Sequence, residues 1–251
     1  MEYYNTKNFQ EKCRNFGICL SDEQIGKFIE YYKLLSEWNS FMNLTAITDF
    51  DEVILKHFVD SLAIYQAEIF QKTLNQKKIE ISLIDVGTGA GFPGIPLKIV
   101  FEDLQIILLD SLNKRVNFLN TVIERLELKN IKAVHGRAED FARHENHREQ
   151  YDFCVSRAVA NLSTLTELCI PFVKKNGYFI SYKSEKVKEE LSAGEKALDI
   201  LGGKIEDILE YQLPDSDISR SLLLIKKEKN TPKKYPRKAG TPAKEPLGGK
   251  I

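Results

Sequence analysis

A glycine-rich stretch that directly follows an apolar run is the first part of the sequence whose residue types suit chemistry. The run covers residues 81–86, and the stretch GTGAGFPG then extends from Gly87 through Gly89 and Phe92 to Gly94. Because glycine lacks a Cβ atom, the chain can turn sharply into a helix there and a ligand can approach the backbone closely. The pattern predicts a ligand site at the carboxyl end of a strand in an open α/β sheet.

Asp110 is the second element of this expected site. It ends the apolar residues 106–109 and lies 23 positions after Gly87. A carboxylate at such a place suits hydrogen bonding to the ribose hydroxyls of a nucleoside. The same side chain can instead cap a helix that begins near Asn113, but its spacing from the glycines favours the ribose role. Together the two elements indicate an adenosine-type ligand.

A third element follows the expected third strand, where Ala138 and Glu139 belong to the stretch GRAED at 136–140. Backbone amides and the Glu139 side chain in this loop can read the edge of an adenine. A capped short helix that binds no ligand is equally compatible with the same residues.

A nicotinamide-dependent oxidoreductase is the main alternative, since Gly89, Gly91 and Gly94 also satisfy the dinucleotide fingerprint. In that register Asp110 follows the last glycine by only 16 residues and Pro93 occupies the helix start, which suits the fingerprint less well. A non-catalytic nucleoside-binding protein built on the same sheet is a third possibility.

Several stretches resemble one family over nearly the whole chain: the 16S ribosomal RNA guanine-N7 methyltransferases, RsmG, also called GidB or glucose-inhibited division protein B. The stretches that carry the resemblance are NLTAI at 43–47, KHFVDSL at 56–62, the loop at 85–94, DSLNKR at 110–115, GRAE at 136–139, SRAVA at 156–160 and YPRKAGTP at 235–242.

The resemblance implies an α/β fold of the class I S-adenosylmethionine-dependent methyltransferases. This fold is a Rossmann-like, seven-stranded, mostly parallel sheet with an antiparallel last strand, here preceded by a small helical region. It also implies S-adenosylmethionine as the cofactor, and 16S ribosomal RNA or the small ribosomal subunit as the partner.

The family's cofactor-binding residues carry over onto matching positions of this sequence. By this resemblance Gly87, Gly89 and Phe92 border the cofactor, and Arg157 lies beside its reacting end. The residues expected on the ribose and adenine side are Asp110, Ser111, Leu112, Ala138 and Glu139.

The expected methyl acceptor needs little catalysis beyond alignment, because guanine N7 already offers a lone pair and no proton must leave first. Accordingly, the fourth strand ends in Val155-Ser156-Arg157 and lacks the Asn/Asp-Pro-Pro-aromatic motif of exocyclic-amine methyltransferases. We assign no catalytic residue, and we expect Arg157 to orient the guanine or an adjacent phosphate. Cys154 lies mid-strand and is interpreted as core rather than as a nucleophile for pyrimidine C5.

Basic side chains provide candidate RNA contacts. Arg115 and Lys183 are two of them, although each can equally be a solvated charge. From Lys226 onward nine Lys or Arg face only two acidic residues, in a chain whose formal net charge is zero. This segment holds Arg237 and Lys238 as further RNA candidates. It has too few apolar side chains to fold alone, and a polyanion could order it.

Other polar residues receive a structural interpretation. His57, Asp60 and Ser61 fall on one helix face at i, i+3 and i+4, and we expect a structural or RNA-docking role for them. His144 and His147 have no further metal ligand nearby in sequence, so we assign no metal. The four cysteines lack C-x-x-C spacing and are interpreted as buried apolar side chains without a disulfide.

The elements that must position these residues follow from apolar periodicity. Ser21 and Gln24 form a capping box before a helix that continues to Trp38, a second helix is expected over 51–70, and 71–78 is a linker. From residue 79 the pattern is typical of βα repeats. We expect strands at 81–86, 105–110, 131–135, 151–156, 177–183, 204–212 and 219–227, and helices at 94–101, 113–127, 138–144, 161–174 and 185–201.

The turn PDSD at 214–217 makes the last two strands antiparallel. The expected organisation is a helical region at 1–78, a methyltransferase domain at 79–228 and a basic tail at 229–251. The sequence shows no secretion signal and no apolar run of the roughly 20 residues that span a bilayer. We therefore expect a cytoplasmic protein, with a monomer as the default.

Overall fold

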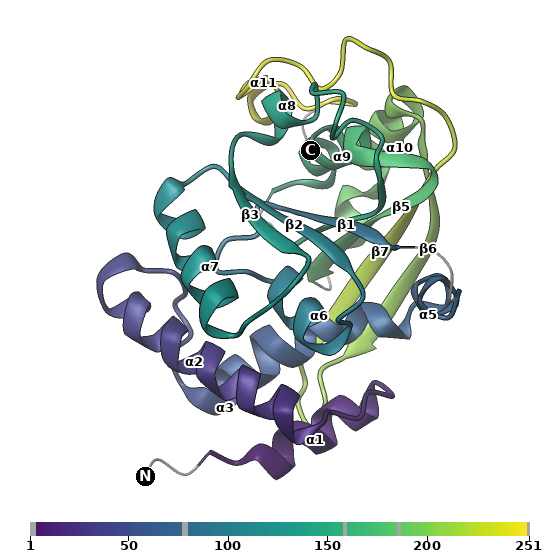
Figure 1. Cartoon of the computed structure of the whole chain (residues 1–251). Coiled ribbons are helices and arrows are strands. Elements are labelled where there is room, and N and C mark those ends of the chain that lie inside the picture. The colour runs from purple at the N-terminus through teal and green to yellow at the C-terminus, as the bar shows by residue number, and fades with distance from the viewer. Residues whose placement is uncertain (1–3, 77–79, 158–159, 185–186, 250–251) are drawn as a thin grey trace.

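The structure is a computed structural model that describes residues 4–76, 80–157, 160–184 and 187–249 (Figure 1). At its centre lies a seven-stranded sheet in the order β3-β2-β1-β4-β5-β7-β6. The strands are β1 (Ser82–Val86), β2 (Gln105–Asp110), β3 (Ile131–His135), β4 (Tyr151–Ser156), β5 (Val173–Ser184), β6 (Gly203–Gln212) and β7 (Ser219–Lys227). All the strands expected from the sequence are confirmed.

The strand β7 breaks the parallel pattern of the sheet. Strands β1 to β5 pair in parallel, whereas β7 is antiparallel to both β5 and β6. The turn at 213–218 is too short for a crossover, so β6 and β7 form a hairpin. Ser184 at the end of β5 pairs with Arg220 at the start of β7. The start of β7 therefore lies at the same edge as the carboxyl ends of the parallel strands.

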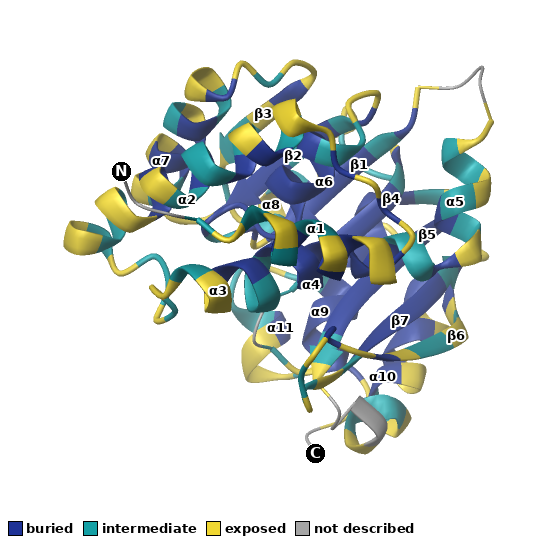
Figure 2. Ribbon diagram, turned by 90° about the horizontal axis from the view of Figure 1, so that it is seen from below, coloured by how far each residue is buried: buried dark blue, intermediate teal, exposed yellow. Residues whose placement is uncertain are grey.

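Helices cover both faces of the sheet. One buried cluster joins it to α1 (Thr6–Asn15), α2 (Asp22–Met42), α6 (Gly94–Val100) and α7 (Asn113–Arg125), and the other joins it to α8 (Ala138–Phe141), α9 (Leu162–Cys169) and α10 (Val187–Leu201). Successive strand residues alternate between the clusters, as Leu83 and Ile84 do. Figure 2 shows the buried strands between helices whose outer sides are exposed.

The capping box expected at the start of α2 is present. The Ser21 hydroxyl accepts a hydrogen bond from the Gln24 amide, and the Gln24 side chain accepts one from the Ser21 amide. This pair satisfies two of the amides that a helix start leaves without partners.

The single helix expected over 51–70 is wrong. The structure has α3 (Phe50–Val53), the π-helical turn η1 (Ile54–Val59), α4 (Asp60–Leu62), the 3₁₀ turn η2 (Ala63–Gln66) and α5 (Glu68–Leu74). The extended Ala67 separates η2 from α5. Apolar periodicity indicates which side is buried, but not whether tertiary contacts widen or tighten a turn. Because α5 continues to Leu74, half of the expected linker is helical, and 77–78 lie outside the described residues.

The helix expected over 161–174 ends early. It stops at Cys169, and the 3₁₀ turn η3 (Ile170–Phe172) leads directly into β5 at Val173. Pro171 lacks a backbone N–H and cannot continue the helical hydrogen bonds, which explains the boundary. The helix expected over 185–201 is present as α10, with 185–186 outside the described residues.

The C-terminal segment, for which a polyanion was suggested as one source of order, packs on the domain. Figure 1 shows the segment in yellow across α8, α9 and α10, with its own short helix α11 (Thr241–Lys244). Tyr235 and Leu247 are buried. The Arg148 guanidinium donates to the carbonyls of Thr231 and Tyr235, each at 2.8 Å. The segment is ordered although it has few apolar side chains, because side chains of the domain bond its backbone.

Within the described ranges, no helix combines the length and the apolar character that crossing a membrane requires.

Candidate functional site

A cavity of about 1030 Å³ opens at the carboxyl edge of the parallel strands. Its walls come from the glycine loop, from the segment after α2, from η1 and α4, and from the ends of β4, β5 and the start of β7. The lining residues are Leu44, Thr45, Ile47, Lys56, His57, Asp60, Gly87, Thr88, Gly89, Ala90, Phe92, Arg115, Arg157, Ala160, Asn161, Tyr182, Lys183, Ser184, Glu190 and Arg220.

The glycine loop has the geometry that its composition predicts. Gly87 and Gly89 have φ angles of 71° and 63°, in the left-handed region that favours glycine. At Gly94, a Cβ atom would lie 2.3 Å from the Leu108 side chain and 2.9 Å from Asp85 Oδ2. Gly94 is therefore required for the close packing of α6 on the sheet.

An N-terminal helix fastens this loop. The buried Tyr31 of α2 donates its hydroxyl hydrogen bond to the carbonyl of Ala90, and its ring lies 5.5 Å from that of Phe92. The helical region thus forms part of the site and does not merely precede it.

Asp110 closes the loop from the side of β2. Its Oδ2 accepts from the amide of Gly89 at 2.9 Å, and its Oδ1 accepts from the amide of Leu112 at 2.9 Å. The N-cap residue of α7 is Leu112, so Asp110 does not cap that helix. The carboxylate links the two segments expected to hold the ribose.

The residues expected on the adenine side lie beyond the lining of the cavity. Ser111 and Leu112 are exposed, and Leu112 has 52% of its surface accessible. Ala138 is half-buried at the start of α8. Glu139 is buried, and its Oε1 accepts from the amide of Gly240 at 2.8 Å. That oxygen is therefore turned to the C-terminal segment, and an adenine contact by Glu139 would use its other atoms.

Arg157 stands at the end of β4, where its guanidinium is held on several sides. It donates from Nη1 to Asp60 Oδ2 at 3.0 Å and to the carbonyl of Lys56 at 3.1 Å. Its central carbon lies 5.0 Å from the centroid of the Phe92 ring. The loop and Arg157 are thus in direct contact. Ala158 and Val159 lie outside the described residues.

His57 is a hydrogen-bonded neutral ring. Burial, with the nearby charges of Arg157 and Lys56, lowers its pKa to about 4. His57 Nδ1 lies 3.2 Å from Arg157 Nη2, which can only donate to it, and 3.1 Å from the carbonyl of Lys56, which can only accept from it, so the tautomer decides which of these two bonds is made. His57 Nε2 lies 2.8 Å from Thr45 Oγ1. Its ring stacks on that of Phe92 at 4.6 Å. His57 and Asp60 are therefore parts of the cavity wall.

Asp85 lies beneath the loop and is fully buried. Its Oδ2 accepts from the Thr88 hydroxyl at 2.7 Å and from the Gly94 amide at 2.9 Å, whereas Oδ1 has no hydrogen-bond partner. Burial raises the pKa of this carboxyl from 3.8 to about 7, although the two hydrogen bonds act in the opposite direction.

The RNA candidates from the sequence fall in two places. Arg115 and Lys183 line the cavity, and Lys183 Nζ also bonds Glu190 at 2.8 Å. Arg237 lies away from it and pairs with Glu167 Oε2 at 2.6 Å. This buried carboxylate engages the Arg237 guanidinium through both oxygens, so an RNA contact by Arg237 would use its remaining atoms. Lys238 is exposed.

Sequence reasoning missed Arg220 and Lys56, which also line the cavity. The pairing of Arg220 with Ser184 brings it there, and the expected β6–β7 hairpin was a signal for this placement. Lys56 belonged to a quoted motif, but nothing in its spacing indicates that it lines the cavity.

His147 and three of the four cysteines are packed in the domain, whereas Cys19 is exposed, which corrects the expectation that all four cysteines are buried. His147 stacks on Phe141 at 3.9 Å and its Nδ1 is 2.7 Å from the Tyr151 hydroxyl. Cys154 is buried, and burial raises its pKa well above the ordinary value. Among the described residues there is no group of three or more side chains placed to hold a metal ion.

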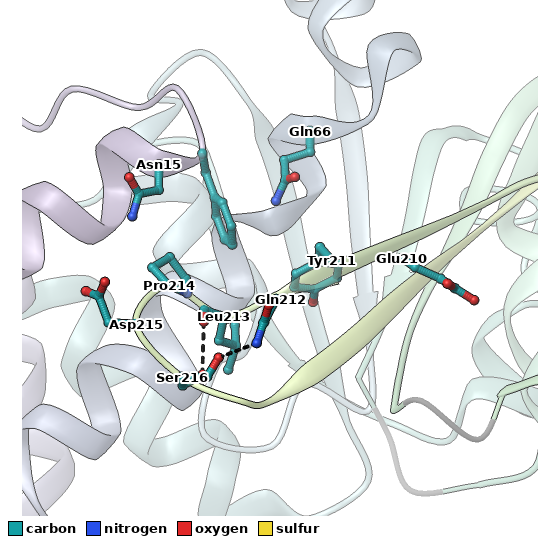
Figure 3. A pocket seen from close by; sticks show the side chains of 10 residues that line it. Asn15, Gln66, Glu210, Tyr211, Gln212, Leu213, Pro214, Asp215 and Ser216 are labelled. Carbon is teal, nitrogen blue, oxygen red and sulfur yellow. Dashed lines mark hydrogen bonds between the residues drawn. The ribbon is translucent and has the colours of Figure 1, made fainter.

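A second, smaller cavity of about 500 Å³ lies outside the glycine loop (Figure 3). It is formed by the end of α1, by Gln66 and by the β6–β7 turn. Lys12 of α1 fixes this turn through Asp215 Oδ2 at 2.7 Å. None of the residues predicted as functional lines it.

The chain matches the family model described as rRNA small subunit methyltransferase G over residues 24–219. It is 56% identical over 243 residues to the ribosomal RNA small subunit methyltransferase G of Lachnoclostridium phytofermentans, which covers 97% of this chain and 98% of that protein. It is 51% identical to the protein of the same description from Clostridium botulinum, over 98% of this chain and 100% of that one.

Among solved structures, a mutant of MtNAS in complex with S-adenosylmethionine matches 89% of this chain and 77% of that chain, at 16% identity and a TM-score of 0.52. At this identity the match supports the fold alone. The sheet order, with its antiparallel end, and the preceding helices are those of the class I methyltransferase fold expected from the sequence. With the family model and both relatives in agreement over most of its length, the chain belongs to the rRNA small subunit methyltransferase G family.

Proposed function

We propose that the protein transfers the methyl group of S-adenosylmethionine to N7 of a guanine in 16S ribosomal RNA, either free or within the small ribosomal subunit. The observation that carries the proposal is a single cavity that joins the glycine loop to Arg157 and to basic side chains of β5 and β7. Membership of the family supports the methyl donor and the class of RNA.

The glycine loop fits the methyl donor. A Cβ atom placed at Gly89 would meet no atom within 4 Å, so the loop leaves open space where it lines the cavity. We assign Gly87, Gly89 and Phe92 to the reacting part of the donor, and Asp110, Ser111, Leu112, Ala138 and Glu139 to its adenosine. When bound, S-adenosylmethionine supplies an electrophilic methyl group on a positively charged sulfur.

The protein's part in the reaction is to align the acceptor. Guanine N7 needs no general base, and His57, being neutral and bonded at both ring nitrogens, is not placed to act as one. Arg157 borders both the loop and the open cavity, so its guanidinium is positioned to orient the guanine or a neighbouring phosphate.

Basic side chains on two surfaces serve the RNA in this proposal. Arg115, Lys183 and Arg220 line the cavity, and Lys238 is exposed on the C-terminal segment. Phosphate contacts by Lys and Arg make RNA affinity fall as salt rises, so replacing any of these residues reduces that dependence. We further expect the protein to act as a monomer in the cytoplasm, which light scattering and cell fractionation test.

Two measurements test the proposal. A calorimetric titration with S-adenosylmethionine and with NAD distinguishes the methyltransferase from an oxidoreductase, since only the first ligand binds on the present account. The Arg157→Ala variant still folds and still binds the cofactor but loses turnover on RNA. Unchanged turnover would refute the role of Arg157, and binding without any methyl transfer would favour a nucleoside-binding protein.

A further inference from the structure

Arg157, the side chain that aligns the acceptor, is itself held by a buried acid. The Asp60 side chain is only 5% exposed, and its Oδ2 lies 3.0 Å from Arg157 Nη1. The other oxygen, Oδ1, accepts from the Tyr211 hydroxyl at 2.8 Å. Burial and Asp60 raise the pKa of Tyr211 well above its ordinary value, so its hydroxyl stays protonated and donates. The carboxylate is thus fixed by donors from β6 and from the end of β4.

The irregular helix before Asp60 makes this arrangement possible. The residue follows the π-helical turn η1, and π-helical turns are frequent at functional sites. The turn also presents the carbonyl of Lys56 to Arg157 Nη1 at 3.1 Å. One short segment therefore supplies two acceptors to a single guanidinium, which fixes its direction as well as its position.

The charge of Asp60 matters because the cavity is rich in cations. Its lining includes Lys56, Arg115, Arg157, Lys183 and Arg220. Three of these have acidic partners of their own: Lys56 pairs with Glu52 at 2.7 Å, Lys183 with Glu190 at 2.8 Å and Arg115 with Asp110 at 3.4 Å. Arg157 and Arg220 share Asp60, which lies 3.0 Å and 3.9 Å from them.

Cationic side chains along the cavity would repel the charged species of the proposed reaction unless their charge is balanced. The methyl donor carries a positive charge on sulfur, and the 7-methylguanine product is also cationic. In a partly buried site the dielectric is low, so an unbalanced guanidinium would raise the free energy of binding a second cation. The side chain that orients the acceptor must therefore have its charge cancelled nearby.

We propose that Asp60 is a positioning residue that directs the Arg157 guanidinium along the cavity wall and cancels its charge, so that a cationic methyl donor can bind beside it. The inference rests on the proposed function, because it takes the donor to be a sulfonium. Asp60 acts through Arg157 and need not touch the donor or the RNA.

The test compares the affinities for S-adenosylmethionine and for S-adenosylhomocysteine, which lacks the methyl group and has a neutral sulfur. Calorimetry gives both dissociation constants for the full-length protein and for Asp60→Asn, Arg157→Gln and the double variant. In Asp60→Asn, the preference for the cationic ligand falls by roughly tenfold, because an unbalanced guanidinium repels the sulfonium. In Arg157→Gln it rises, and in the double variant it returns towards the wild-type value.

Two further variants separate charge from packing. Tyr211→Phe removes a hydrogen bond to Asp60 but keeps both charges, so its ligand preference stays at the wild-type value. Asp215→Asn makes the same chemical change in the surface pair with Lys12 and also leaves the preference unchanged. Thermal unfolding of each variant checks that the proteins compared are folded.

If Asp60→Asn lowered the affinities for both ligands equally, or lowered neither, the inference would be overturned while the proposed function stood. A changed preference in Tyr211→Phe would also overturn it, because that result would assign the effect to packing. If the wild-type protein bound neither ligand, the proposed function itself would fail.

Discussion

The backbone amide of Gly240 donates a hydrogen bond to Glu139 Oε1 across 2.8 Å and ties the C-terminal segment to α8. The same segment reaches α9 through the carbonyl of Pro242, which accepts from the Thr164 hydroxyl at 3.1 Å. The two helices flank the expected adenosine side and the acceptor side of the site. The segment therefore serves the architecture of the domain as well as any contact with RNA.

Arg237→Met is expected to destabilise the fold. Glu167 is completely buried, so removing its partner leaves an uncompensated charge in the interior. Because Arg237 itself is partly exposed, we expect a loss of roughly 2–4 kcal/mol in the free energy of unfolding, measured with urea. The neighbouring Lys238→Met is the control: it changes stability by less than about 0.5 kcal/mol but weakens RNA binding at low salt. Equal stability of the two variants would contradict this assignment.

Asp110→Asn is expected to weaken the binding of S-adenosylmethionine. Both carboxylate oxygens accept backbone amides, from Gly89 and from Leu112. An asparagine has only one acceptor oxygen, so either the Gly89 amide or the Leu112 amide loses its hydrogen bond. The remaining hydrogen bond is weaker because its acceptor is no longer charged. We expect roughly tenfold weaker binding by calorimetry. Asp140→Asn, on the exposed side of α8, provides the control, and equal affinities of the two variants would argue against a role for Asp110 in holding the loop.

Gly94→Ala is expected to lower stability by about 1–3 kcal/mol, because the new methyl group overlaps the Leu108 side chain. Gly26 offers a matched comparison, since a Cβ atom there meets nothing within 4 Å. Gly26 lies in the second turn of α2, where Gly26→Ala should stabilise the protein by about 0.5–1 kcal/mol. Thermal or urea unfolding reports both changes, and the expectation fails if they have the same sign.

The buried Asp85 gives the stability a dependence on pH. Its pKa is raised from 3.8 to about 7, so between these values the folded protein binds more protons than the unfolded chain. The stability contributed by this group is therefore lost as pH rises through that window. The side chain of the Asp85→Asn variant cannot ionise. At pH 8 the free energy of unfolding of this variant, measured with urea, should exceed that of the wild type by roughly 1–3 kcal/mol. At pH 4 that advantage should disappear, and a pH-independent difference would contradict the cause given.

Much of the fold can be predicted from local sequence patterns, because each βα unit contains the same alternation of apolar and polar residues. The pairing of β6 with β7 and its antiparallel direction are specified by the short connection at 213–218. The spacing of the glycines and of Asp110 likewise located the loop and the carboxylate that binds it. The loop needs backbone conformations that glycine adopts readily.

The remaining features depend on contacts between distant parts of the chain. The pairing of Arg237 with Glu167 joins residues 70 positions apart and has no local signal. The π-helical turn before Asp60 is set by what packs against it, and the apolar pattern is the same as for a regular helix. Pro171, by contrast, was a local signal for the end of α9, and the apolar periodicity around it extended the expected helix too far.

The most direct test of the account offers radiolabelled S-adenosylmethionine to the wild-type protein with small ribosomal subunits and with naked 16S RNA, followed by digestion and chromatography of the nucleosides. The proposed function predicts that the label appears in 7-methylguanosine. Label in any other nucleoside, or no transfer by a protein that binds the donor, would contradict it.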